Sequence, residues 1–168
     1  DFYKAANNIK PSLIRTNADE LTYHLHVLIR YEIEKELIEG KIMAKDLPDI
    51  WNLKYHEYLG VEVPSDALGV LQDIHWSHGS FGYFPTYTIG SFYAAQFFNQ
   101  AKIENPNLLK EIEDGNNKNL LNWLRKNIHN NGKRLDAHQL CEKISGEKLN
   151  FKYFKEYVIE KYSKIYSL

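Results

Sequence analysis

Apolar residues recur at steps of three and four early in the chain, which predicts an amphipathic helix. The residues of this apolar stripe are Leu21, Leu25, Leu28, Ile29, Ile33 and Leu37. Thr16 is a suitable N-cap, Asp19 would lie in the first turn, and Gly40 would stop the helix. The pattern therefore predicts a helix over residues 17–39.

The next elements are marked by proline and glycine. Asp46-Leu47-Pro48 has the pattern of a cap followed by a helix start, and this helix is expected to end near Leu59-Gly60. Residues 60–69 are expected to form a connecting loop, in which 61–63 are compatible with a short extended piece. Four shorter helices are expected near the C-terminus, at 107–113, 117–130, 136–145 and 151–166.

One expected helix differs from the others because it is apolar on most of its sides. It covers residues 87–101, with Pro85 in the first turn. A helix that is apolar all round is normally buried in a large protein. We therefore expect an absent partner half to cover it. The predicted fold is all-α, with at most a short strand or hairpin near 60–82, in one helical segment over 1–168.

Composition excludes several classes of protein. The 21 basic residues nearly balance the 22 acidic ones, which argues against nucleic-acid binding. No run approaches the roughly 18 apolar residues of a membrane-spanning helix. Cys141, the only cysteine, excludes an internal disulfide and a cysteine-based zinc site, and it favours a reducing, cytoplasmic location.

Two short polar blocks, residues 14–20 and 69–76, are the candidates for chemistry. Each places several polar side chains between apolar residues, and a protein core tolerates this only when the polar groups have partners. The sequence contains no His-Glu-x-x-His metal motif. The nearest match begins at His56-Glu57 but has Gly60 in place of the second histidine. His24 and His26 would point about 200° apart on a helix and cannot share a metal. The sequence thus assigns no metal to this chain.

Arg15, His75, Tyr83 and Tyr87 are the side chains best suited to bind a polar ligand. Arg15 presents a planar fork that matches a carboxylate. Asp19, four residues later, is expected either to pair with Arg15 within a helix or to hold it toward an anion. A histidine can donate a proton near neutral pH, and a tyrosine O–H can stabilise an oxyanion. For His75 and the two tyrosines, plain packing remains the alternative.

The two blocks resemble signature motifs of the carboxypeptidase Taq family, which are zinc-dependent carboxypeptidases. The matching residues are Ile14-Arg15-x-x-Ala18-Asp19-Glu20-Leu21-Thr22-Tyr23 and Gly69-x-x-Gln72-Asp73-x-His75-Trp76. Residues 80–87 are similar to the segment after the second motif in that family. The likeness extends over nearly the whole chain.

The resemblance implies a mostly helical enzyme with a deep groove that removes the last residue of a peptide. Its zinc ligands would lie before this chain. The chain would therefore be a C-terminal segment that binds no metal and is inactive without the N-terminal half of the same enzyme. A homodimer stays open. The rival hypothesis is a stand-alone helical module that binds peptides or proteins without chemistry.

The resemblance also implies a role for each candidate residue. Arg15 would hold the substrate carboxylate, and Tyr87 would join it in binding substrate. His75 and Tyr83 would donate hydrogen bonds to the scissile carbonyl. The residues expected to orient these groups are Asp19, Gln72 and Asp73.

Overall fold

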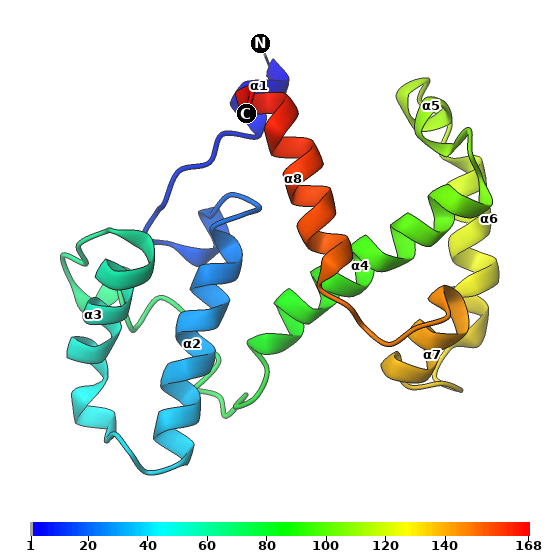
Figure 1. Cartoon of the computed structure of the whole chain (residues 1–168). Coiled ribbons are helices and arrows are strands. Elements are labelled where there is room, and N and C mark those ends of the chain that lie inside the picture. The colour runs from blue at the N-terminus through cyan, green and yellow to red at the C-terminus, as the bar shows by residue number, and fades with distance from the viewer. Residues whose placement is uncertain (1) are drawn as a thin grey trace. The chain divides into compact units, whose positions relative to one another are not determined.

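Every regular element in the computed structural model, which describes residues 2–168, is helical (Figure 1). The all-α prediction is confirmed, and residues 61–63 are irregular rather than extended as a strand. The chain divides into two compact units, one ending at Ile89 and the other beginning at Gly90. The α-helices are α1 (Phe2–Ala6), α2 (Tyr23–Ile38), α3 (Leu47–Leu59), α4 (Pro85–Glu104), α5 (Leu108–Glu113), α6 (Lys118–Asn127), α7 (Ala137–Ser145) and α8 (Lys152–Tyr166).

The start of α2 differs from the prediction. Residues 15–17 form a separate 3₁₀ turn, and α2 begins only at Tyr23. Asp19 caps the start of α2, because its Oδ1 accepts hydrogen bonds from the backbone amides of Leu21 and Thr22, at 2.9 and 2.8 Å. Asp19 thus binds backbone amides near the start of the helix that would otherwise lack partners. The sequence pattern predicts this capping role for Thr16 instead.

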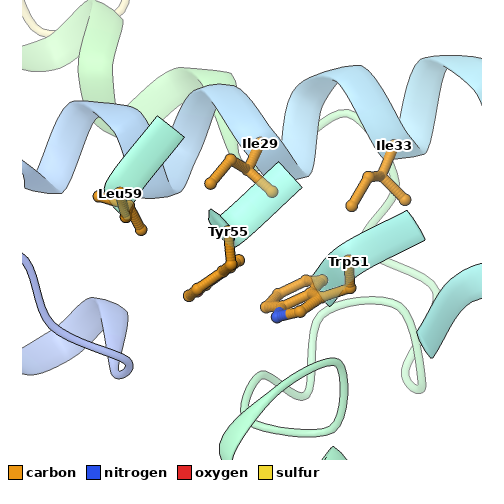
Figure 2. Packing of buried hydrophobic residues seen from close by; sticks show 5 residues of the cluster. All are labelled: Ile29, Ile33, Trp51, Tyr55 and Leu59. Carbon is orange, nitrogen blue, oxygen red and sulfur yellow. The ribbon is translucent and has the colours of Figure 1, made fainter. Parts of the chain in front are cut away.

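The core of the first unit forms between α2 and α3. Ile29 and Ile33 from α2 face Trp51, Tyr55 and Leu59 from α3, and all five are buried (Figure 2). Each set repeats at four-residue intervals, so each helix presents one continuous face to the other. The rings of Trp51 and Tyr55 stack with centroids 5.0 Å apart. This packing fixes α2, the helix that carries His26, Arg30 and Glu34.

The loop after α3 begins at a left-handed residue. Gly60 has φ 65°, and its backbone amide donates to the carbonyl of His56. Glycine reaches this conformation without steric cost, so α3 ends where the sequence predicts.

The second unit is built around Ala101, Leu108 and Trp123, which are buried together. From Gly90 onward, α4 packs within this unit: Phe92 lies 5.0 Å from both Phe151 and Phe154, measured between ring centroids. Of the apolar residues of α4, Ala101 is buried, Phe92, Phe97 and Phe98 are partly buried, and Ile89 and Ile103 are exposed. That a further partner half covers α4 stays a prediction.

Helix α1 was not predicted. Helix α4, expected over 87–101, runs from Pro85 to Glu104, and α3 and α5 to α8 lie close to their predicted positions. Helix α6, expected to end at residue 130, ends at Asn127 and is followed by a 3₁₀ turn over His129–Asn131. Over residues 2–168, none of the helices combines the length and the apolar character needed to cross a bilayer.

Candidate functional site

Asp73 is the centre of the candidate site because it binds two arginines at once. Its Oδ1 accepts from Nη2 and Nε of Arg15, at 2.7 and 3.1 Å, and its Oδ2 accepts from Nε of Arg30 at 2.6 Å. The side chains of Asp73, Arg15 and Arg30 are 11, 8 and 0% exposed, so these ion pairs are largely shielded from water. Residues 58 positions apart in the sequence are joined here.

Gln72 joins the same two segments through a fully used amide group. Its Oε1 accepts from the backbone amide of Arg15 at 3.0 Å and from Nη2 of Arg30 at 2.8 Å. Its Nε2 donates to the carbonyls of Leu13 and Leu68, at 3.0 and 3.1 Å. Both polar atoms of Gln72 are therefore committed to holding the 13–15 segment against the second motif.

Gly69 opens the second motif for a steric reason. A Cβ at this position would lie 2.7 Å from Cγ1 of Val63 and 3.2 Å from the carbonyl oxygen of Ser65. Real Cβ atoms do not approach neighbours this closely, so the turn that delivers Gln72 and Asp73 needs glycine here.

An aromatic group closes over the charged centre. Phe84 is 1% exposed, and its ring centroid lies 4.2 Å from that of His75. The guanidinium carbons of Arg15 and Arg30 lie 5.8 and 5.5 Å from the Phe84 ring centroid. Phe84 thus keeps water away from the Asp73 ion pairs and strengthens their electrostatics.

His75 bridges the aromatic group and the charges. Its Nε2 lies 3.1 Å from the Tyr87 hydroxyl, and its buried Nδ1 lies 4.0 Å from Oδ1 of Asp73. Burial lowers the pKa of the imidazole, and the negative charge of Asp73 offsets this only in part. His75 is therefore neutral at pH 7, and the nearby carboxylate favours its single proton on Nδ1.

The structure brings most of the predicted site residues together. Tyr83 lies beside His75 and Tyr87, with ring centroids 5.8 and 5.4 Å away, and it is 49% exposed. The Tyr87 ring centroid lies 5.1 Å from the guanidinium carbon of Arg15. These contacts place two phenols, one imidazole and one guanidinium in a single neighbourhood.

Asp19 does not join this group in the predicted way. The partner of Arg15 is Asp73, and Oδ2 of Asp19 instead accepts from the Thr22 hydroxyl and the Lys10 amide, at 2.7 and 3.0 Å. The predicted Arg15–Asp19 pair is wrong because Arg15 precedes α2, so the two residues do not share a helix face.

The family model described as carboxypeptidase Taq (M32) metallopeptidase matches residues 1–162. The chain belongs to this family.

Its relatives in the M32 family are considerably longer. Carboxypeptidase 1 of Bacillus subtilis is 44% identical over 168 residues, which is all of this chain and 34% of the relative. Thermostable carboxypeptidase 1 of Thermus thermophilus is 44% identical over 166 residues, or 99% of this chain and 32% of the relative. The chain thus spans about a third of the length of these relatives.

A solved structure agrees closely with the fold. The M32 carboxypeptidase from Deinococcus radiodurans R1 superposes with a TM-score of 0.96 at 40% identity, covering 99% of this chain and 34% of that one. The arrangement of helices described above is therefore that of a segment of an M32 enzyme.

The M32 family consists of metallopeptidases, yet residues 2–168 do not contain three His, Cys, Asp or Glu side chains placed to hold a metal ion. Asp73 is bound by two arginines, and His24 and His26 contact Thr88 and Tyr55 respectively. These residues do not fit a metal site, so no metal-dependent step is assigned to them.

Several members of the site were not singled out from the sequence. Phe84 and Tyr23 are two of them, and Arg30, His26 and Tyr55 form a connected group of three. Nη1 of Arg30 donates to the His26 carbonyl at 2.8 Å and to the Tyr55 hydroxyl at 3.2 Å, and that hydroxyl lies 3.0 Å from Nδ1 of His26. A signal was present, because Arg30 directly follows Ile29 of the apolar stripe, where a charged residue needs a buried partner.

We expect His26 to make the first unit sensitive to acid. Burial lowers its pKa from 6.5 to about 4, and the charges of Arg30 and Arg15 add to this. Because the unfolded state binds the proton first, the free energy of unfolding falls as the pH drops from 6.5 to 4. The expected loss is about 3 kcal/mol, at roughly 1.4 kcal/mol per pH unit.

The measurement is urea unfolding at several pH values, monitored by NMR through the backbone amide signals of α2. His26→Asn keeps a polar atom near Tyr55 but cannot titrate, so its pH dependence should be flatter than that of the wild type. His129→Asn, at an exposed position, serves as the matched control. Equal pH dependence in the wild type and His26→Asn would contradict the prediction.

Proposed function

We propose that this chain is the part of an M32 metallocarboxypeptidase that binds the C-terminal carboxylate of a peptide substrate. The chain would act together with the rest of a longer enzyme, which would hold the zinc or another divalent metal. The family membership and the geometry around Arg15 support this proposal. By itself, the chain is expected to hydrolyse nothing.

The hydrogen bonds of Arg15 carry the argument. Of its five N–H groups, Nε and one on Nη2 donate to Asp73, and one on Nη1 donates to the Tyr23 hydroxyl. Two N–H groups remain, one on each terminal nitrogen, and they can bind both oxygens of a carboxylate. Asp73 and Tyr23 hold the fork in place, which lowers the entropic cost of binding.

Tyr83 is the better candidate to stabilise an oxyanion. Nε2 of His75 already faces the Tyr87 hydroxyl at 3.1 Å, whereas Tyr83 is half-exposed next to both rings. In the proposal, Tyr83 donates to the scissile carbonyl, and His75 keeps Tyr87 oriented beside Arg15. A donor of this kind contributes roughly 3–4 kcal/mol to transition-state stabilisation.

The proposal is tested by NMR titration of the 168-residue chain with two peptides, acetyl-Ala-Ala as the free acid and as the amide. We expect the free acid to shift the Nε–H signal of Arg15, and the amide to shift it at least tenfold less at equal concentration. The backbone amide of Asp73, which contacts Arg15, should also respond to the free acid and not to the amide. Arg15→Lys has no Nε–H signal, but it should abolish the difference at the Asp73 amide, while Arg125→Lys, at an exposed position on α6, should preserve it. Equal responses to the two peptides would rule out carboxylate binding at Arg15.

A further inference from the structure

Glu34 connects the two ends of the loop that leads to Tyr83. It lies on α2, one turn after Arg30, and is 6% exposed. Its Oε2 accepts a hydrogen bond from the indole Nε1 of Trp76 at 2.8 Å. Its Oε1 accepts one from the backbone amide of Gly82. A single carboxylate therefore fixes the beginning and the end of residues 76–82.

The hydrogen bonds inside this loop are local. The Gly79 amide donates to the carbonyl of Trp76 at 3.1 Å, and the Ser80 amide donates to that of His75 at 2.8 Å. Such bonds shape the turn but do not attach it to a helix. Glu34 supplies that attachment, and Gly82 presents its amide in a left-handed conformation, φ 79°, that favours glycine.

Burying the carboxylate of Glu34 is energetically unfavourable, and packing alone would not require a carboxylate here. Among the ion pairs of residues 2–168, none includes Glu34, so its buried carboxylate is balanced by neutral N–H donors. Burying a charge without a counter-charge is unfavourable, and both oxygens must accept hydrogen bonds to offset it. Glutamate has the two acceptors that this bridge requires.

The residues directly after the loop belong to the candidate site. Tyr83 follows Gly82, and Phe84 then packs on His75 with ring centroids 4.2 Å apart. We propose that Glu34 is a positioning residue that sets the place of Tyr83 and Phe84 by clamping the 76–82 loop to α2. This inference rests on the proposed function, because it assigns Glu34 a purpose in the same reaction.

The clamp itself is tested by amide hydrogen exchange in the 168-residue chain. Glu34→Gln retains one acceptor, but its NH₂ group must face one of the two donors. We expect exchange at Gly82 to rise at least tenfold. Glu36→Gln, on the same helix and paired with Lys54 at 3.8 Å, should leave this exchange unchanged.

A second variant shows whether the effect comes from the bridge rather than from general loosening. The second variant combines Glu34→Gln with Trp76→Phe. Trp76→Phe removes the indole donor, so the glutamine at position 34 can accept a hydrogen bond from the Gly82 amide without facing a second donor. Protection at Gly82 should then return to within threefold of its value in Trp76→Phe alone. Gly82 exchange that is unchanged by Glu34→Gln, or unprotected in the double variant, would overturn the clamp.

The positioning role is tested by kinetics in a complete M32 enzyme that contains this chain. Glu34→Gln should lower kcat about tenfold with little change in KM, because Arg15 still binds the carboxylate while Tyr83 is displaced. Unchanged kcat together with faster Gly82 exchange would refute the positioning role and leave the clamp intact. Failure of the proposed function is recognised separately, by equal NMR responses to the free-acid and amidated peptides.

Discussion

Asp73→Asn is expected to lower the free energy of unfolding of the first unit by about 3–5 kcal/mol, the usual cost of removing one partner from a buried ion pair. The amide can accept from one guanidinium, but its NH₂ group must face the other. Arg30, which is completely buried, would then lose its counter-charge. The loss is measured by urea unfolding that is monitored through hydrogen exchange at the backbone amides of Ile29 and Ile33.

Glu39→Gln is the matched control, since it also removes a carboxylate that binds two cations. Glu39 pairs with Lys41 at 2.6 Å and with Lys35 at 3.9 Å, but these side chains are exposed. Exposed pairs contribute roughly 0–1 kcal/mol, so little change is expected. Comparable losses in the two variants would contradict the view that Asp73 holds the site together.

The pH dependence gives a second check on Asp73. Burial alone would raise its pKa, but the hydrogen bonds and charges of Arg15 and Arg30 outweigh burial and hold the pKa below 3.8. A carboxylate with a lowered pKa stabilises the fold above its unfolded pKa and loses this contribution as the pH falls through the folded value. The difference between wild type and Asp73→Asn should therefore shrink below about pH 4.

The helices could be predicted because local signals agree with the packing. Ile29 and Ile33 follow the helical period, and Gly60 ends α3 through a left-handed cap. The start of α2 could not be predicted reliably, because Thr16 and Asp19 are both good caps. Hydrogen bonds from Arg15 to Gln72 and Asp73 keep residues 15–17 out of the helix. These contacts join segments that are distant in the sequence, so the local sequence pattern gives no sign of them.

The composition of the site was predictable only where its residues lie in the two motifs or in residues 80–87, which follow the second motif and contain Tyr83 and Tyr87. Arg15, Gln72, Asp73 and His75 all meet, but the partners among them could not be deduced from sequence spacing. Asp19 is close to Arg15 in the sequence, whereas Asp73, 58 residues away, binds it. Glu34 belongs to neither motif. Ion pairs and clamps between distant segments depend on the tertiary fold, so they escape patterns of three and four residues.

In a complete M32 enzyme containing this chain, Arg15→Lys is expected to lower kcat/KM for free-acid peptides about a hundredfold, and Arg15→Ala further. Hydrogen bonds to charged groups are worth about 1.5–3 kcal/mol each, and the ammonium of lysine cannot reproduce two parallel bonds. Tyr23, which binds Nη1 of Arg15 at 3.2 Å, allows a graded test. Tyr23→Phe should cost no more than about tenfold, because it loosens the fork without removing it.

The control for the Arg15 variants is a substrate with an amidated C-terminus. The wild type should turn it over slowly, and Arg15→Ala should reduce that rate by less than threefold, since this substrate has no carboxylate to bind. The rival view makes Arg15 only a structural partner of Asp73, 2.7 Å away. Under that view both substrates lose activity by the same factor, and the free energy of unfolding falls as in Asp73→Asn. Measuring kcat/KM for both substrates, with unfolding of the same variants, decides between them. A loss confined to the free-acid substrate assigns Arg15 to the substrate carboxylate, because a structural defect does not distinguish one peptide terminus from another.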